Sequence, residues 1–210
     1  MYVPPAFAIT DQAALQAVMA ANSFATVVSA GKQGLMATQV PVLIDPARGP
    51  RGTIVLHLAR ANPHWQDLQE VEAMVLFQGP HAYVSPRWYA NDAAVPTWNY
   101  VAVHAYGRAR LIFDRTELRT LVARLAAHHE SGAARPWSLD RVPETQINGL
   151  LKAIVGLEIP IDRIEGKAKL SQNRKAEDRR GVIDALAASA DAGDRALAGA
   201  MARLESKVEA

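Results

Sequence analysis

Residues 97–113 read TWNYVAVHAYGRARLIF, and their alternate positions carry two different kinds of side chain. One set is small or branched: Val101, Val103, Ala105, Gly107, Ala109 and Leu111. The other set is aromatic or basic: Trp98, Tyr100, His104, Tyr106, Arg108 and Arg110. Because successive side chains of a strand point to opposite faces, this pattern predicts one long strand or hairpin arm. The small set suits the interior of a small barrel, and the aromatic and basic set suits a ligand or a partner surface.

The segments on either side of this stretch add more strands and several helices. Before residue 97 the sequence predicts a helix over 11–22, a short helix beginning at Pro63, strands at 24–30, 35–45, 53–59, 73–78 and 81–85, and a loop over 86–96. After residue 113, Asp114 and Glu117 have the spacing of a capping box and predict a helix, and a second helix follows Pro143. Strands over 155–170 and an Ala-rich helical tail complete the chain.

This order of elements predicts the fold class. Strands that are grouped, without regular alternation with helices, favour an antiparallel barrel over a parallel sheet. We therefore expect a mainly β protein with peripheral helices. No linker rich in Gly, Ser or Pro divides residues 1–185, so we expect a single domain there and a C-terminal helical tail at 186–210.

Composition excludes several kinds of chemistry. The chain has 210 residues, of which 50% are hydrophobic and 21% charged, as in ordinary globular proteins. Because it has no cysteine, it cannot form disulfides, cysteine-ligated zinc sites or thiol nucleophiles. We find neither a secretory signal nor an apolar run of about 20 residues, and we expect a cytoplasmic protein outside the membrane. The net charge of +2 is too weak a bias to indicate nucleic-acid binding.

Common catalytic and nucleotide-binding motifs are missing. The sequence has no glycine fingerprint of a Rossmann fold, no phosphate-binding loop and no Gly-x-Ser-x-Gly elbow. The pair His128-His129 lies in a predicted helix, where adjacent side chains point about 100° apart. We therefore expect no metal site there.

Two polar clusters lie beside predicted strand ends. Residues 57–65 run from a strand directly into a helix, where backbone amides and Arg60 suit a phosphate, although an ordinary turn capped by Asn62 is the alternative. Residues 96–100 bring together Thr97, Trp98 and Asn99, which can stack on a planar ring and hydrogen-bond its edge. A rigid strand start packed on a neighbour is the alternative for this second cluster.

A third cluster is basic and amide-rich. Ser, Gln and Asn occupy positions 171–173 within a segment that has six basic and two acidic residues. The basic residues are Lys167, Lys169, Arg174, Lys175, Arg179 and Arg180. A solvated helix face is the alternative reading. Together the three clusters offer cationic donors for a phosphate, an aromatic wall and edge donors, which are the requirements of flavin mononucleotide (FMN).

The same segments carry a family resemblance. The sequence resembles the PaiB-type FMN-binding negative transcriptional regulators, which belong to a split-barrel group with pyridoxine 5′-phosphate oxidase and flavin reductase-like proteins. The matching stretches are residues 1–4, 57–68, 77–86 (FQGPHAYVSP), 95–107 (including VPTWNY) and 169–174 (KLSQNR). The resemblance implies a six-stranded antiparallel FMN-binding split β-barrel that forms a homodimer, with FMN bound between the subunits.

The resemblance also implies which residues bind FMN. It sets the ring against the strand at 36–40 and the phosphate near the turn after residue 57. To the phosphate side we assign His57, Ala59, Arg60 and Asn62. To the ring we assign Thr38, Gln78, Trp98 and Asn99, with Gln39 beside Thr38 on the same strand. From the C-terminal part, Lys169, Gln172 and Asn173 close the pocket.

Three functions remain open on the sequence: a transcriptional regulator, an FMN-dependent oxidoreductase or flavin reductase, and a flavin-binding or haem-related protein without turnover. The helices after Asp114 and Pro143 are separated by too long a loop for a helix-turn-helix, and no acid–base pair stands out as catalytic. Any DNA contact would therefore use residues 167–180 and would depend strongly on salt.

Overall fold

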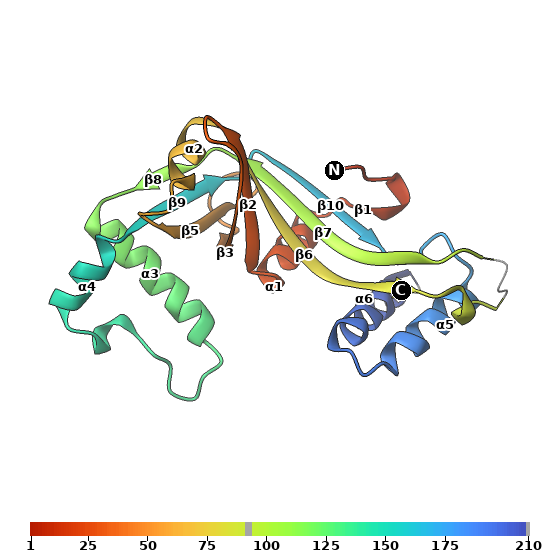
Figure 1. The fold of residues 1–210 in the computed structure, drawn as a ribbon. Coiled ribbons are helices and arrows are strands. Elements are labelled where there is room, and N and C mark those ends of the chain that lie inside the picture. Colours follow the sequence, from red (N-terminus) through yellow and green to blue (C-terminus); the bar gives the residue numbers. More distant parts are fainter. Residues whose placement is uncertain (91–93, 209–210) are drawn as a thin grey trace. The chain divides into compact units, whose positions relative to one another are not determined.

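The computed structural model describes residues 1–90 and 94–208, which form two compact units (Figure 1). Unit 1 comprises Met1–Val18, Gln78–Val103 and Glu165–Ala210, and unit 2 comprises Met19–Phe77 and His104–Ile164. Residues 91–93 of the expected loop and 209–210 of the expected tail lie outside the described residues. In the part of the chain that the structure describes, no helix is long and apolar enough to cross a membrane.

The helices agree with the sequence predictions. They are α1 (Gln12–Ala21), α2 (His64–Glu70), α3 (Arg115–Glu130), α4 (Glu144–Leu151), α5 (Ala176–Ala187) and α6 (Ala192–Val208), with single 3-10 turns η1 (Pro5–Phe7), η2 (Pro86–Trp88) and η3 (Leu139–Arg141). The start of α3 shows why the prediction succeeds. One carboxylate oxygen of Asp114 accepts the backbone N–H groups of Thr116 and Glu117, each at 2.9 Å, which satisfies two donors that have no partner within the helix.

The strands are more numerous than the predicted segments. They are β1 (Ala8–Ile9), β2 (Phe24–Gly31), β3 (Gly34–Pro41), β4 (Leu43–Asp45), β5 (Thr53–Ala59), β6 (Ala73–Val84), β7 (Thr97–Gly107), β8 (Arg110–Ile112), β9 (Ile154–Pro160) and β10 (Arg163–Lys169). The expected strand at 35–45 divides into β3 and β4. Conversely, the two strands expected at 73–78 and 81–85 are one continuous strand, β6.

Two antiparallel sheets confirm the fold class. One has six strands in the order β1-β10-β7-β6-β2-β3, and the other has four in the order β4-β5-β9-β8. The hairpin of β2 and β3 is paired along its whole length, from Phe24 opposite Pro41 to Gly31 opposite Gly34. The protein is therefore a split-barrel type of β structure with peripheral helices.

The alternation of residues 97–113 holds through β7 and then ends. Val101, Val103 and Ala105 are buried as predicted, at 7%, 0% and 0% exposure. A Cβ at Gly107 would lie 2.0 Å from the carbonyl oxygen of Pro160, so only glycine fits this close backbone approach. The strand is interrupted after Gly107, and in β8 Ile112 is the buried residue in place of the expected Leu111.

Each unit has its own apolar core. In unit 1, α5 and α6 pack through Val182, Leu186, Leu197 and Met201 against strand residues that include Val101. The expected boundary between domain and tail, at residue 186, falls within α5. In unit 2, α3 and α4 cover the four-stranded sheet, and their apolar stripes bury residues of β4, β5 and β8 (Figure 1). The unit 2 core comprises Leu43, Val55, Ile112, Leu118, Leu121, Leu125, Ile147 and Leu151.

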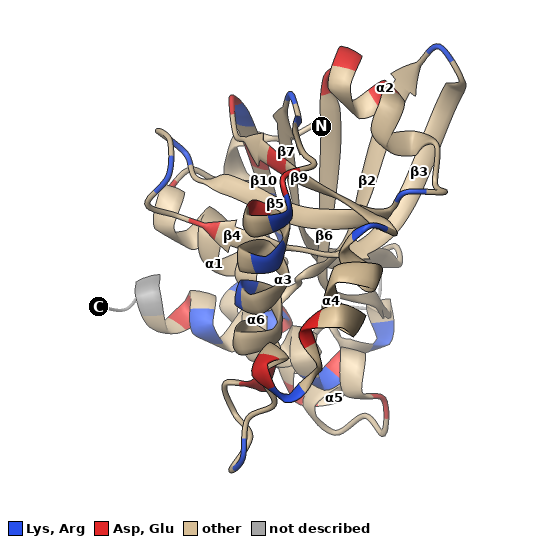
Figure 2. Ribbon diagram, turned by 90° about the vertical axis from the view of Figure 1, so that its left-hand side faces the viewer, with Lys and Arg blue, Asp and Glu red and all other residues tan. Residues whose placement is uncertain are grey.

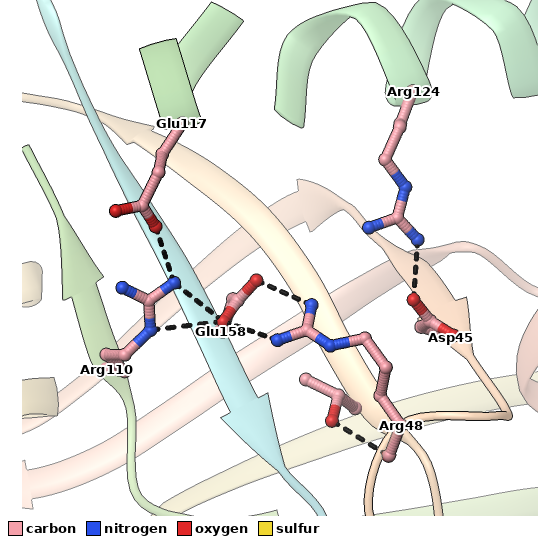
Figure 3. Close-up of polar contacts among 7 residues, drawn as sticks. Asp45, Arg48, Arg110, Glu117, Arg124 and Glu158 are labelled. Carbon is pink, nitrogen blue, oxygen red and sulfur yellow. Dashed lines mark hydrogen bonds and ion pairs between the residues drawn. The ribbon is translucent and has the colours of Figure 1, made fainter. Parts of the chain in front are cut away.

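A buried carboxylate joins several elements of unit 2. Glu158 in β9 accepts both terminal nitrogens of Arg48 at 2.6 and 2.8 Å, and Nε and Nη2 of Arg110 at 3.1 and 2.9 Å (Figure 3). Arg110 also donates to Glu117 of α3 at 2.7 Å. The hydrogen bonds from Arg48, followed by those from Arg110, lower the pKa of Glu158 to about 2, against the opposing effect of burial.

The depressed pKa of Glu158 predicts a specific loss of stability in acid. The unfolded chain takes up this proton near the ordinary pKa of 4.5, whereas the folded chain takes it up only near 2. Stability from this group is therefore complete above pH 4.5 and disappears as the pH falls towards 2. The linkage between protonation and folding gives Glu158 a contribution of about 3 kcal/mol to the free energy of unfolding at neutral pH. Urea unfolding at a series of pH values from neutral to 2 measures this contribution.

Two variants make this prediction decisive. Glu158→Gln should lose about 3 kcal/mol at neutral pH and flatten the acid dependence, because two arginines lose their shared carboxylate. Glu117→Gln is the matched control, since its exposed pair with Arg110 should be worth less than about 1 kcal/mol. Equal losses in the two variants would contradict the assignment to Glu158.

Candidate functional site

A relay of hydrogen bonds underlies the strand that the sequence assigned to the ring. In unit 2, His64 at the start of α2 bonds through Nδ1 to the Thr38 hydroxyl at 2.8 Å and through Nε2 to the Ser29 hydroxyl at 3.0 Å. The amide nitrogen of Asn62 donates to the same Thr38 oxygen at 3.3 Å, while its carbonyl oxygen accepts the backbone N–H of His64. The predicted residues Thr38 and Asn62 are therefore brought together.

The position of the proton on the His64 imidazole decides which way the relay is polarised. His64 has no exposed surface, and desolvation lowers its pKa, with Asp67 acting in the opposite direction. A neutral imidazole has one donor and one acceptor nitrogen. If Nδ1 carries the proton, it donates to Thr38. Thr38 then accepts from both His64 and Asn62, and its own hydrogen is free for a ligand.

Asp67 holds the turn of the hairpin beside this relay. Its carboxylate, 4% exposed, accepts the backbone N–H groups of Lys32 and Gln33 at 3.2 and 3.3 Å. A Cβ at Gly31 would lie 2.3 Å from the Asp67 carboxyl carbon, so the absence of a side chain admits the carboxylate. The relay and this carboxylate together join α2 to β2 and β3.

The other predicted residues of unit 2 lie around this centre without joining the relay. Gln39 follows Thr38 on β3 and so points to the opposite, exposed face of the hairpin. The Arg60 guanidinium donates to the carbonyl oxygens of Lys152 and Ile154 at 2.9 and 3.1 Å. Ala59 pairs with Ile154 at the end of β5.

His57, which the sequence assigned to the phosphate side, takes no part in the relay. Its Nδ1 is buried without a hydrogen-bond partner among the described residues, and burial lowers its pKa. It pairs with Gly156 of β9 in the four-stranded sheet.

Unit 1 holds an exposed aromatic platform. The Trp98 side chain, 54% exposed, stacks with the ring of His81 at a centroid distance of 6.4 Å and meets Tyr83 edge-on at 6.2 Å. Gln78 donates through its amide nitrogen to His81 at 3.3 Å. The structure therefore brings the predicted residues Gln78 and Trp98 into one cluster, to which it adds His81 and Tyr83.

Asn99 points the other way from its neighbour Trp98. It is fully buried, and its amide nitrogen donates to the Ser171 hydroxyl at 2.8 Å and to the Met201 sulfur at 3.6 Å. Its carbonyl oxygen has no hydrogen-bond partner among the described residues. Ser171 has a φ of 65°, a left-handed backbone that few non-glycine residues adopt.

The C-terminal residues of the predicted site make local contacts. The Lys169 ammonium donates to the Thr97 hydroxyl and to the Trp98 carbonyl, both at 2.5 Å, and burial lowers its pKa first, ahead of the nearby Lys167 and Arg174 charges. Gln172 folds back on its own turn, accepting the backbone N–H of Leu170 at 2.7 Å. Asn173 lies in the same turn before α5, and its side chain is exposed.

The sequence did not single out Ser29, His64 or Asp67 as site residues. His64 follows a helix-starting proline, and nothing in that position indicates two hydroxyl partners 35 and 26 residues away. Among the described residues, no three His, Asp or Glu side chains lie close enough to hold a metal ion.

The fold and these groups define a class of protein: a split-barrel structure with an exposed aromatic platform and a hydroxyl–imidazole relay, both suited to a flavin. Residues 1–163 match the family model described as "Putative FMN-binding domain". The chain belongs to this family.

One relative agrees with this assignment, and two solved structures are similar in fold. The chain is 35% identical over 187 residues, covering 89% of each chain, to "Protease synthase and sporulation protein PAI 2" of Bacillus subtilis (strain 168). It is similar in fold to the flavocytochrome Anf3 from Azotobacter vinelandii, with a TM-score of 0.60, 18% identity and coverage of 83% of this chain and 75% of that one. A FAD and heme binding protein from Mycobacterium smegmatis gives a TM-score of 0.58, 16% identity and coverage of 82% and 78%.

The burial of His64 predicts that its imidazole takes up a proton at a lower pH than an exposed histidine does. The NMR resonances of its ring should therefore titrate with a midpoint below the ordinary pKa of about 6.5. Since the unfolded chain binds this proton more readily, stability should fall as the pH drops below that value. His64→Gln should reduce this fall between about pH 7.5 and 5.5. A His64 ring that titrates with an ordinary midpoint would contradict the prediction.

Proposed function

We propose that this chain is an FMN-binding protein of the PaiB type in which the Trp98 platform of unit 1 contacts the flavin ring. The observation that carries the proposal is the exposed Trp98–His81–Tyr83 cluster with the Gln78 amide beside it, within a chain of an FMN-binding family. An indole with more than half of its surface exposed offers an apolar wall to a flat ring, and a neighbouring amide can hydrogen-bond the ring edge. Bound FMN supplies the redox chemistry of its isoalloxazine ring.

In unit 2, the Thr38 relay is a separate candidate contact for an acceptor atom of FMN. Thr38 is half-buried, and its oxygen already accepts from Asn62. With the His64 proton on Nδ1, the hydroxyl hydrogen of Thr38 is directed to a ligand oxygen or nitrogen. Ser29 then donates to Nε2, which completes the relay. In this arrangement His64 is a positioning residue, and Thr38 is the group that contacts FMN.

FMN titration of purified variants, followed by flavin fluorescence, tests these contacts. Thr38→Val and Trp98→Leu should each weaken binding about tenfold, because one loses a donor and the other the ring wall. Trp137→Leu is the matched control, since this exposed indole lies outside both groups. An unchanged affinity in both test variants would reject the proposed contacts.

The phosphate side has its own test. Arg60→Ala combined with Asn62→Ala should weaken FMN binding, and Arg119→Ala should not. Arg60 and Asn62 also make the internal contacts described above, so thermal unfolding must show that the double variant is folded. An unchanged affinity in a folded double variant would reject the assignment of these residues to the phosphate.

The proposal extends to a homodimer. On the β2–β3 hairpin, Phe24 and Leu35 lie on the same face and are 71% and 79% exposed. β3 is the last strand of its sheet, and the other residues of this face are Thr26, Val28, Ala30, Ala37, Gln39 and Pro41. An exposed apolar face at a sheet edge is costly unless another chain covers it. The covering chain in this proposal is a second copy.

Light scattering after size exclusion tests the dimer. Leu35→Lys should shift the protein towards monomer, because a charge would have to be buried at the interface. Leu150→Lys on α4 is the matched control, because Leu150 is also an exposed apolar residue but lies away from the hairpin. A wild-type monomer, or an unchanged dimer in Leu35→Lys, would count against this interface.

The basic segment at 167–180, which the sequence analysis named as the surface for any DNA contact, gives little support to a regulatory role. Lys167 is 7% exposed, Arg179 pairs with Glu205 at 2.8 Å, and Arg174 stacks on the Tyr89 ring at 4.8 Å. With Lys169 also engaged, most of these cations already have intramolecular partners. A regulatory role therefore rests on the resemblance of residues 95–107 and 169–174 to the PaiB-type regulators.

A further inference from the structure

Unit 2 has a groove on the α3 side of the four-stranded sheet. It encloses about 370 Å³, and its polar lining includes Arg48, Arg110 and Arg124. Val55, Ile112 and Leu121 supply an apolar part of the wall. A volume near 370 Å³ lies at the lower end of the range of small-molecule pockets. None of the residues assigned to FMN lines this groove.

The arginines of the groove keep unused donors. A guanidinium has five N–H groups and stays protonated. Arg110 uses Nε and Nη2, and Arg124 uses only Nη2, in a bond to Asp45 at 2.7 Å (Figure 3). Within the described part of the chain, Nη1 of Arg110 and both Nε and Nη1 of Arg124 donate to no protein group. Both side chains are about half exposed, at 52% and 42%.

The two glutamates that line the groove differ in how firmly they are held. The side chain of Glu158 is 12% exposed and binds two arginines, whereas that of Glu117 is 49% exposed and binds only Arg110. An exposed ion pair contributes little, so the Glu117 carboxylate can leave Arg110 at small cost. The lining carries three arginines and two glutamates, and Asp45 outside the lining pairs with Arg124. The groove therefore gains a net positive charge, which favours an anion, once Glu117 has left Arg110.

We propose that this groove binds a small organic oxyanion, a carboxylate or phosphate monoester, separately from the FMN site. Its anionic group takes the position of the Glu117 carboxylate on Arg110 and reaches Arg124. Its apolar part lies against Ile112 and Leu121. Glu158 remains in place and keeps Arg110 oriented. The proposal is independent of the proposed function, because it uses none of the residues assigned to FMN.

An NMR titration of the full chain with phenyl phosphate tests the groove. Saturable shifts of the backbone amides of Thr116, Glu117 and Thr120 are expected. Benzyl alcohol, which lacks the charge, and inorganic phosphate, which lacks the ring, should each bind at least about tenfold more weakly. Absence of saturable shifts, shifts centred on Thr38 with displacement of FMN, or equal affinity for inorganic phosphate would each overturn the proposal.

Variants on one helix sharpen the test. Arg124→Gln should weaken phenyl phosphate binding about tenfold, and Glu117→Gln should strengthen it severalfold because the competing carboxylate is gone. Arg119→Gln is the matched control: Arg119 lies on the same helix but pairs with Asp140 and Glu144 outside the groove. Figure 2 shows α3 with its Lys and Arg segments in blue. Thermal unfolding confirms that each variant is folded. Equal affinities in Arg124→Gln and Arg119→Gln, or weaker binding in Glu117→Gln, would refute this arrangement.

Discussion

The need to satisfy buried polar side chains fixes the position of α2 against the β2–β3 hairpin. His64 and Asp67 are almost completely buried, and unpaired they would each cost more than a buried apolar residue. His64 finds the Ser29 and Thr38 hydroxyls, and Asp67 finds the backbone amides of the turn. The same hydrogen bonds therefore fix both the placement of α2 and the orientation of the Thr38 hydroxyl, the candidate flavin-contacting group.

In the four-stranded sheet of unit 2, a buried charged group is likewise satisfied by partners from several elements. Glu158 is buried in the ionised form because two guanidinium groups share its oxygens. This arrangement ties the β4–β5 turn, β8 and β9 together, and through Arg110 it reaches α3. It also leaves the outer edges of the arginines in contact with solvent. The group that stabilises the sheet thereby also lines the proposed anion groove, which shares no residue with the proposed FMN contacts.

Much of the fold could be predicted because its signals are local. Asp114 caps α3 through bonds to residues two and three positions away, and the burial of Val101 and Val103 follows from alternation within one strand. Predictions were wrong where distant residues intervene. The alternation after Gly107 ends where the backbone of β9 approaches at Pro160. Strand β6 continues past residue 78 in a sheet where it lies between β7 and β2.

The amino-acid sequence alone determined the secondary-structure types, the β-rich split-barrel class and the family, because periodicity, capping residues and motif strings are properties of neighbouring positions. The tertiary structure alone decided which polar groups meet. His64 joins Thr38 across 26 residues, Arg48 joins Glu158 across 110, and Asn99 faces inward while Trp98 faces outward. The physical reason is that hydrogen bonds and ion pairs depend on distances of about 3 Å, which only the packing of helices against sheets establishes.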